Sequence, residues 1–162
     1  MEGEWGLLTE RKLLLGNLGM IITFGVCLLL SLLLRGSGQN AMVIISEVIG
    51  ALTFITAIIA VIYIKSIQKW VPISVIAFLS VWLVFMIGYE AGIHASTPYQ
   101  WIWFLVFYLV TVTSIVYLRL GYEKVEGNYK LLPAFFLFFN SMLTVSMIFI
   151  HIWWNLPFWG KG

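Results

Sequence analysis

The chain has 162 residues, of which 62% are hydrophobic and only 10% are charged, and its mean hydropathy is +1.01. A soluble domain is about half apolar and about a quarter charged, so this composition excludes an ordinary water-soluble fold. Nine basic and seven acidic residues give a formal net charge of +2, which leaves no basic surface for nucleic acid. We therefore expect the lipid bilayer, and no nucleic acid, to be the main partner of the chain.

Five apolar stretches are long enough to cross a membrane as helices. About 20 apolar residues cross about 30 Å of hydrocarbon, because a helix satisfies its own backbone polar groups. The spans are expected at 13–34, 41–64, 71–89, 101–118 and 131–154, and the breaks between them are short and polar. Short breaks make consecutive helices antiparallel neighbours. The predicted fold is an all-α bundle of five transmembrane helices, forming a single transmembrane domain over residues 1–162.

The first span lies near the N-terminus behind Arg11 and Lys12, as the apolar part of a signal peptide would. Its apolar run is too long for such a segment, and no small-residue cleavage motif follows it. We expect it to be a retained transmembrane helix.

The basic residues in the short flanks predict the orientation of the chain in the membrane. The N-terminal tail and the second and fourth breaks contain seven of them: Arg11, Lys12, Lys65, Lys69, Arg119, Lys124 and Lys130. The opposite flanks contain two, Arg35 and Lys161. We expect a cytoplasmic N-terminus and, with five spans, a C-terminus on the outer side.

Aromatic residues gather at the ends of the spans on the predicted outer side. They are Tyr89, Tyr99, Trp101, Trp103, Trp153, Trp154 and Trp159. Amphipathic rings favour the headgroup boundary, so we expect an interfacial aromatic belt, with a ligand-binding aromatic box as the alternative.

Two stripes of small or polar residues at helical spacing predict contacts between helices. The first span carries Gly16, Met20, Thr23, Cys27 and Ser31, and the fifth carries Asn140, Thr144, Met147 and His151. Small and weakly polar side chains let helix backbones approach in lipid. We expect the first stripe to face protein and the second to face the bundle interior or a partner subunit. Gly50 and Ala51 in the second span predict another close contact beside Glu47.

Four ionisable residues fall in the outer leaflet of the predicted topology: Glu47, Glu90, His94 and His151. An ionisable group costs at least about 2.5 kcal/mol at the centre of a membrane helix, so it pairs, faces an interior or has a function. Carboxylates and imidazoles bind copper, iron or haem, which makes these four residues candidate metal ligands. In one alternative, Arg35 neutralises Glu47 or Glu90 and the two histidines stay neutral. In another, the four ionisable residues form a path for protons or a substrate.

Other chemistry finds no support in the sequence. The chain has no Asp, one cysteine (Cys27), and no motif of a hydrolase, a nucleotide-binding protein or a zinc protease. We expect an integral, non-catalytic subunit of a larger membrane complex, such as a respiratory-type oxidoreductase assembly. One alternative is a metal- or haem-binding redox subunit. The other is a small oligomeric transporter or channel, with its path along the stripe from Asn140 to His151.

Overall fold

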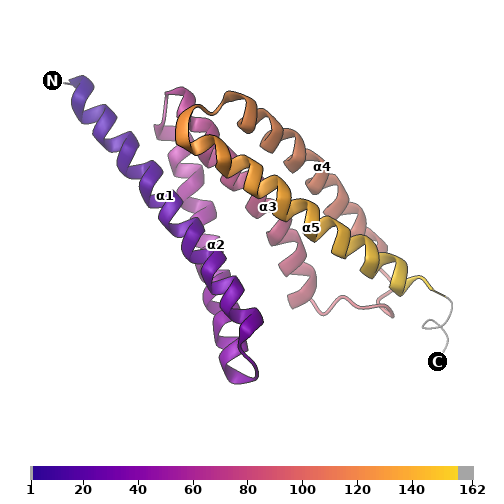
Figure 1. Cartoon of the computed structure of the whole chain (residues 1–162). Helices are drawn as coiled ribbons and strands as arrows, with labels where there is room; N and C mark the ends of the chain where they lie inside the picture. Colours follow the sequence, from indigo (N-terminus) through magenta and orange to yellow (C-terminus); the bar gives the residue numbers. More distant parts are fainter. Residues whose placement is uncertain (1, 157–162) are drawn as a thin grey trace. The chain divides into compact units, whose positions relative to one another are not determined.

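The computed structural model describes residues 2–156 of the chain as an all-helical protein (Figure 1). Its five α-helices are α1 (Glu2–Leu33), α2 (Ser37–Tyr63), α3 (Trp70–Glu90), α4 (Gln100–Lys124) and α5 (Leu131–Trp154). Short 3₁₀ turns at Ile67–Lys69 and Gly127–Lys130 precede α3 and α5. All five helices are long and apolar enough to cross a membrane. The prediction of five apolar helices of membrane-spanning length is confirmed in number and approximate position, and their orientation stays a prediction.

The helices extend beyond the apolar spans at polar ends. α4 continues to Lys124, six residues past the predicted end of its span, and α1 begins at Glu2 rather than near residue 13. In the last turns of α4, Arg119 and Glu123 form an ion pair at 3.4 Å between residues four apart, a spacing that supports a helix. Hydropathy predicts where the apolar residues end, but the helix itself continues beyond them.

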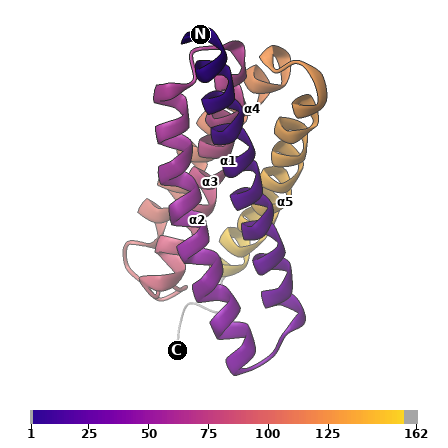
Figure 2. The same cartoon turned by 90° about the vertical axis from the view of Figure 1, so that its left-hand side faces the viewer.

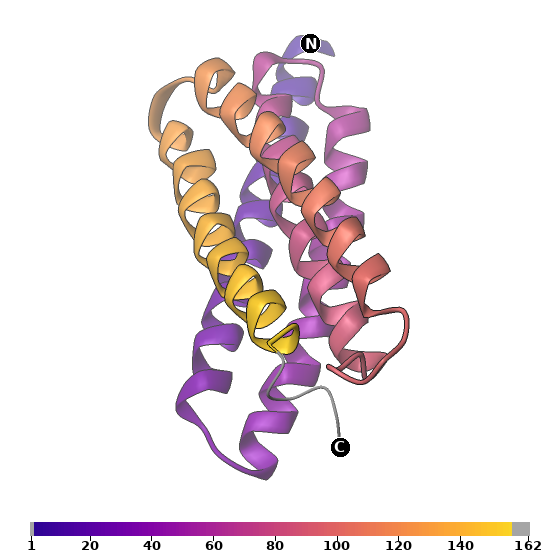
Figure 3. The ribbon, with the colours of Figure 1, turned by 90° about the vertical axis from the view of Figure 1, so that its right-hand side faces the viewer.

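The chain divides into two compact units, residues 1–76 and residues 77–162, with the boundary inside α3. In the first unit α1 and α2 form an antiparallel hairpin, which Figure 2 shows along its length. In the second unit α4 and α5 form another, seen in Figure 3. That the two units make up a single transmembrane domain stays a prediction.

The α1–α2 hairpin places large side chains on one helix and small ones on the other. α1 buries Leu14, Asn17, Ile21, Phe24 and Ser31, and α2 buries Ser46, Gly50, Thr53, Ala57 and Ala60. The buried positions of α2 repeat every three or four residues, and those of α1 do so from Leu14 to Phe24, which is the spacing of one helix face. Small residues on the buried face of α2 permit close approach of another helix.

The predicted stripe on α1 faces protein only in part. Met20 accepts a hydrogen bond from the Thr56 hydroxyl of α2 on its sulfur at 3.6 Å, and Ser31 is buried. Gly16 and Thr23 are exposed, and a Cβ added at Gly16 would meet nothing within 4 Å. The buried face of α1 therefore includes larger residues such as Ile21 and Phe24.

The α2 prediction is confirmed in part, since Gly50 is buried and Ala51 is exposed.

The second unit has a core built largely from aromatic residues. The buried side chains of Val81, Phe104, Phe107 and Met147 form one cluster from α3, α4 and α5. Nearer the start of α5, the rings of Phe78 and Phe136 stack with centroids 4.6 Å apart. The seam residues of α4 again repeat at intervals of three or four: Phe104, Phe107, Thr111, Ser114, Leu118 and Gly121. The same spacing of buried positions therefore recurs here, with phenylalanine and leucine among them.

Candidate functional site

A buried polar group joins α3, α4 and α5 in the second unit. Asn140 Nδ2 donates a hydrogen bond to Ser114 Oγ at 2.8 Å, and that hydroxyl donates to the carbonyl oxygen of Ala77 at 2.7 Å. Asn140 lies nine residues after Leu131, the first residue of α5, or about 14 Å into the helix at 1.5 Å per residue. Polar side chains at such depth stabilise a membrane protein only by finding partners on other helices. We call these three residues the C-terminal polar node.

Two oxygens beside this node have no hydrogen-bond partner among the described residues. They are Asn140 Oδ1 and Thr111 Oγ1, and both atoms are enclosed. The amide is oriented by its bond to Ser114, since Ser114 donates its own proton to a carbonyl and can only accept from Asn140. Thr111 lies one helical turn before Ser114 on the same buried face of α4.

A similar, looser polar contact joins α1 and α2. Asn17 Nδ2 donates to the carbonyl oxygen of Thr53 and to the hydroxyl of Thr56, each at 3.3 Å. The Thr56 hydroxyl in turn donates to the Thr53 carbonyl oxygen at 3.0 Å. We call Asn17, Thr53 and Thr56 the N-terminal polar node.

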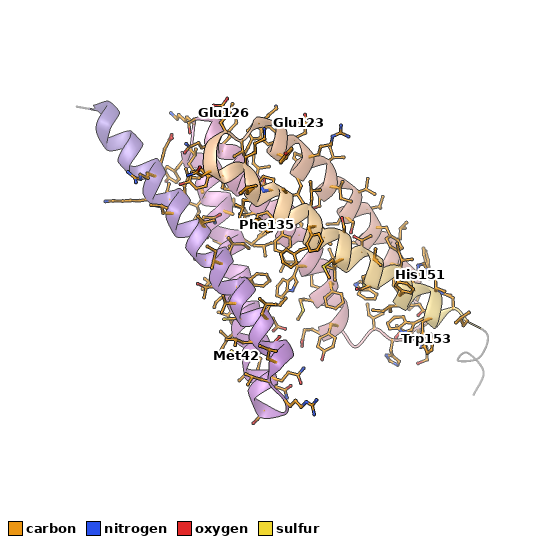
Figure 4. All side chains as sticks on the ribbon, viewed as in Figure 1. Met42, Glu123, Glu126, Phe135, His151 and Trp153 are labelled. Atoms are coloured by element: carbon orange, nitrogen blue, oxygen red, sulfur yellow. The ribbon has the colours of Figure 1, made fainter. Side chains whose placement is uncertain are left out.

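An aromatic cluster surrounds His151 near the end of α5. The hydroxyl of Tyr108 and Nδ1 of His151 are hydrogen-bonded at 3.0 Å. The imidazole stacks on Phe104 with centroids 4.1 Å apart and an interplanar angle of 11°, and Trp154 meets the same phenyl ring edge-on. Figure 4 shows His151 at the opposite end of the α4–α5 hairpin from Glu123 and Glu126. The imidazole ring is thus held by both stacking and a hydrogen bond.

Trp103 belongs to the same cluster and ties α4 to α3. Its indole N–H donates to the carbonyl oxygen of Val84 at 2.9 Å, and the ring covers Gly88. A Cβ on Gly88 would overlap the indole. The glycine therefore makes room for this contact.

The stripe predicted on α5 does face the interior of its unit. Asn140 and Met147 are fully buried, while Thr144 and His151 are half-buried. This prediction is confirmed.

The predicted belt residues divide into two groups. Tyr89, Tyr99, Trp101 and Trp153 are exposed, as a belt requires, whereas Trp103 and Trp154 pack into the aromatic cluster. Trp159 lies outside the described residues.

The four predicted metal ligands occupy different environments. Glu47 is half-buried on α2 in the first unit, and Glu90 is exposed at the end of α3. His94 is exposed in the following connection, close to the Gly92 carbonyl oxygen and the Thr97 hydroxyl. His151 belongs to the aromatic cluster. Across residues 2–156, no three His, Cys or Glu side chains form a group that could hold a metal ion. The metal or haem site stays a prediction.

Glu90 and His94 do not share a helix face, because α3 ends between them. Gly92 adopts a positive φ of 65°, its N–H donates to Tyr89, and the N–H of Ile93 donates to Gly88, each at 3.0 Å. These two bonds are those of a Schellman motif, which closes a helix at a left-handed glycine. Arg35, considered as a partner of either glutamate, is exposed in the turn before α2.

Asn17, Thr111 and Ser114 are among the interior polar residues that the sequence analysis missed, as are Ser46, Thr53 and Ser74. Each carries a polar side chain within an apolar span, and each lies three or four residues from other seam positions. That spacing is the signal that could have identified them.

No protein-family model matches the chain, and neither a curated protein nor a solved structure is similar to it. The proposals below therefore depend on the chain's own residues.

Proposed function

We propose that the protein is an integral, non-catalytic subunit of a larger membrane complex, such as a respiratory-type oxidoreductase assembly. The observation that carries this proposal is an exposed stripe of small residues on α1, formed by Gly16, Gly19 and Thr23. A Cβ added at either glycine would meet nothing within 4 Å, and the Thr23 hydroxyl donates to the Gly19 carbonyl oxygen of its own helix. In lipid, small residues on a helix surface permit close approach of another helix. The stripe therefore suits contact with a helix of a second subunit.

The polar groups inside the spans support a structural role. In each unit, an asparagine amide and nearby hydroxyl groups are used to connect helices. Glu90 and His94 are exposed, and they lie near the same end of the second unit as His151. This group of ionisable residues is the reason for naming a respiratory-type oxidoreductase assembly as the example.

The test is the native mass of the tagged, full-length chain extracted in mild detergent. We expect a complex well above the 18.5 kDa of one chain, and release of the chain by Gly16→Leu. Ala51→Leu is the matched control, since it also adds a leucine side chain at an exposed position, but on α2. A wild-type chain that migrates alone, or equal effects of the two variants, would contradict the proposal.

The proposed orientation has the N-terminus in the cytoplasm and the C-terminus outside. It is supported by the seven-to-two distribution of basic residues. In a Cys27→Ser background, a cysteine at Ser96 should react with an impermeant reagent added outside intact cells, whereas one at Glu126 should not. The reverse labelling pattern would contradict the proposed orientation and indicate the opposite one.

A second candidate function, a small oligomeric transporter or channel, is favoured by the enclosed oxygens of Thr111 and Asn140. Polar groups inside a membrane protein often mark a path for protons or polar solutes. In reconstituted vesicles, a proton flux that Asn140→Leu abolishes would favour this function over the subunit.

The remaining alternative, a metal- or haem-binding redox subunit, is tested by metal analysis and the optical spectrum of the purified complex.

A further inference from the structure

Four basic side chains flank the same end of the α1–α2 hairpin. Arg11 and Lys12 belong to α1, Lys65 and Lys69 to the connection between α2 and α3, and all four are exposed. The backbone N–H of Lys65 donates to Glu10 Oε1 at 3.1 Å. This bond places Lys65 beside the turn of α1 that carries Arg11 and Lys12, and Lys69 follows four residues later in the same connection. We call these four residues the basic cluster.

The basic cluster lies at the boundary of the apolar segments. The membrane-length segment of α1 begins at Glu10, that of α2 ends at Tyr63, and the next begins at Ile67. Tyr63 is exposed beside the cluster, in the position typical of an interfacial aromatic residue. When these apolar segments cross a bilayer, cations at their ends are level with the phosphate groups of phospholipids.

Among the side chains that the structure describes in the first unit, Glu10 is the acidic one beside this cluster. Its carboxylate accepts the Lys65 N–H and keeps its negative charge, so four cations accompany one carboxylate. The basic residues around the connection between α4 and α5 are more evenly balanced by carboxylates. There Arg119 pairs with Glu123, Lys130 lies over the Tyr122 ring, and Glu126 adds another carboxylate.

We propose that the basic cluster binds the headgroup of an anionic phospholipid, such as phosphatidylglycerol. Arginine and lysine donate charge-assisted hydrogen bonds to phosphate oxygens, and the arginine fork suits two oxygens at once. Each cation near a membrane surface contributes about 1 kcal/mol toward anionic lipid, which is about fivefold in affinity. The two lysines of the α2–α3 connection together should contribute about 25-fold.

The experiment is a lipid titration of the purified full-length chain, followed by native mass spectrometry, which resolves each bound lipid. Wild-type protein should bind phosphatidylglycerol at least tenfold more tightly than phosphatidylcholine. Lys65→Gln with Lys69→Gln should lower phosphatidylglycerol affinity about 25-fold and leave phosphatidylcholine binding unchanged. Arg119→Gln with Lys130→Gln is the matched control, since it removes the same charge from the other unit, and it should change phosphatidylglycerol affinity less than threefold.

Three outcomes would overturn the proposal: equal wild-type affinity for the two lipids, equal losses in the two double variants, or displacement of the lipid by millimolar inorganic phosphate. The last would indicate a site for soluble anions. Circular dichroism and the thermal unfolding midpoint of each variant provide the folding control. If the lysine pair fails to fold, Arg11→Gln with Lys12→Gln tests the same cluster from α1, without altering the connection.

Discussion

The two helical hairpins use the same seam geometry with different side chains. Both repeat their buried positions every three or four residues, and both contain one nearly inaccessible asparagine, Asn17 at 3% exposure and Asn140 at 0%. The α1–α2 hairpin packs large residues against small ones, whereas the second unit relies on aromatic rings from three helices. In lipid, close packing and hydrogen bonds together replace the hydrophobic drive between helices. The comparison shows that these two contributions can be combined in different proportions.

The polar nodes differ in the same way. The two hydrogen bonds that the Asn17 amide donates are each 3.3 Å long, while those of the C-terminal polar node are 2.8 and 2.7 Å. Shorter hydrogen bonds across three helices are expected to stabilise more than long ones across two. The first hairpin should therefore depend mainly on its small residues, and the second unit on its node and its aromatic core.

The largest expected effect is at the small-residue seam of α2. Ala57→Leu places a bulky side chain at a position with 0% exposure, and overpacking should lower the free energy of unfolding by about 3 kcal/mol. The measurement is reversible unfolding in mixed micelles. Ala51→Leu, on the exposed face of the same helix, should change stability by less than about 0.5 kcal/mol. Equal effects would remove the distinction between the two faces of α2.

The second prediction contrasts one glycine from each unit. Gly88→Ala should lower the free energy of unfolding by about 2 kcal/mol, because the added Cβ displaces Trp103 from its contact with α3. Gly16→Ala should be neutral, or stabilising by up to about 1 kcal/mol in the isolated chain, since its Cβ meets nothing and alanine favours helix. Tryptophan fluorescence should change for the first variant alone. A stable Gly88→Ala protein with unchanged fluorescence would contradict the contact.

The third prediction compares the two asparagines. Asn140→Leu should destabilise its unit by about 1 kcal/mol, and Asn17→Leu by about half as much, because the bonds of Asn17 are longer. A double-mutant cycle of Asn140→Leu with Ser114→Ala should show a coupling free energy of about 1 kcal/mol. Absence of coupling would mean that the bond at 2.8 Å does not stabilise the unit.

The smallest expected effect is in the aromatic cluster. Tyr108→Phe removes the hydroxyl bonded to His151 and should cost about 0.5 kcal/mol, since the stacking of the imidazole on Phe104 remains. The nitrogen chemical shifts of His151, measured by NMR, should change at Nδ1. Unchanged shifts would show that stacking alone holds the ring.

Local composition determined much of the architecture. Five spans and their approximate positions follow from hydropathy, because a helix in lipid must be apolar over the thickness of the bilayer whatever its neighbours are. The inward-facing stripe on α5 also follows from sequence, since Asn140 lies in a strongly apolar helix and an amide in that setting needs a partner. Both inferences require only the helix itself and the lipid around it.

The tertiary structure alone decided which face of α1 is buried, where α3 stops and what the asparagines bind. The face of α1 that is buried includes Ile21 and Phe24 and leaves Gly16 exposed, and it carries the contact of Asn17 with Thr53 of α2. The end of α3 depends on the left-handed backbone at Gly92, which separates Glu90 from His94. These features are contacts between segments distant in the sequence or choices of backbone conformation, and a count of apolar residues within one helix contains no information about either.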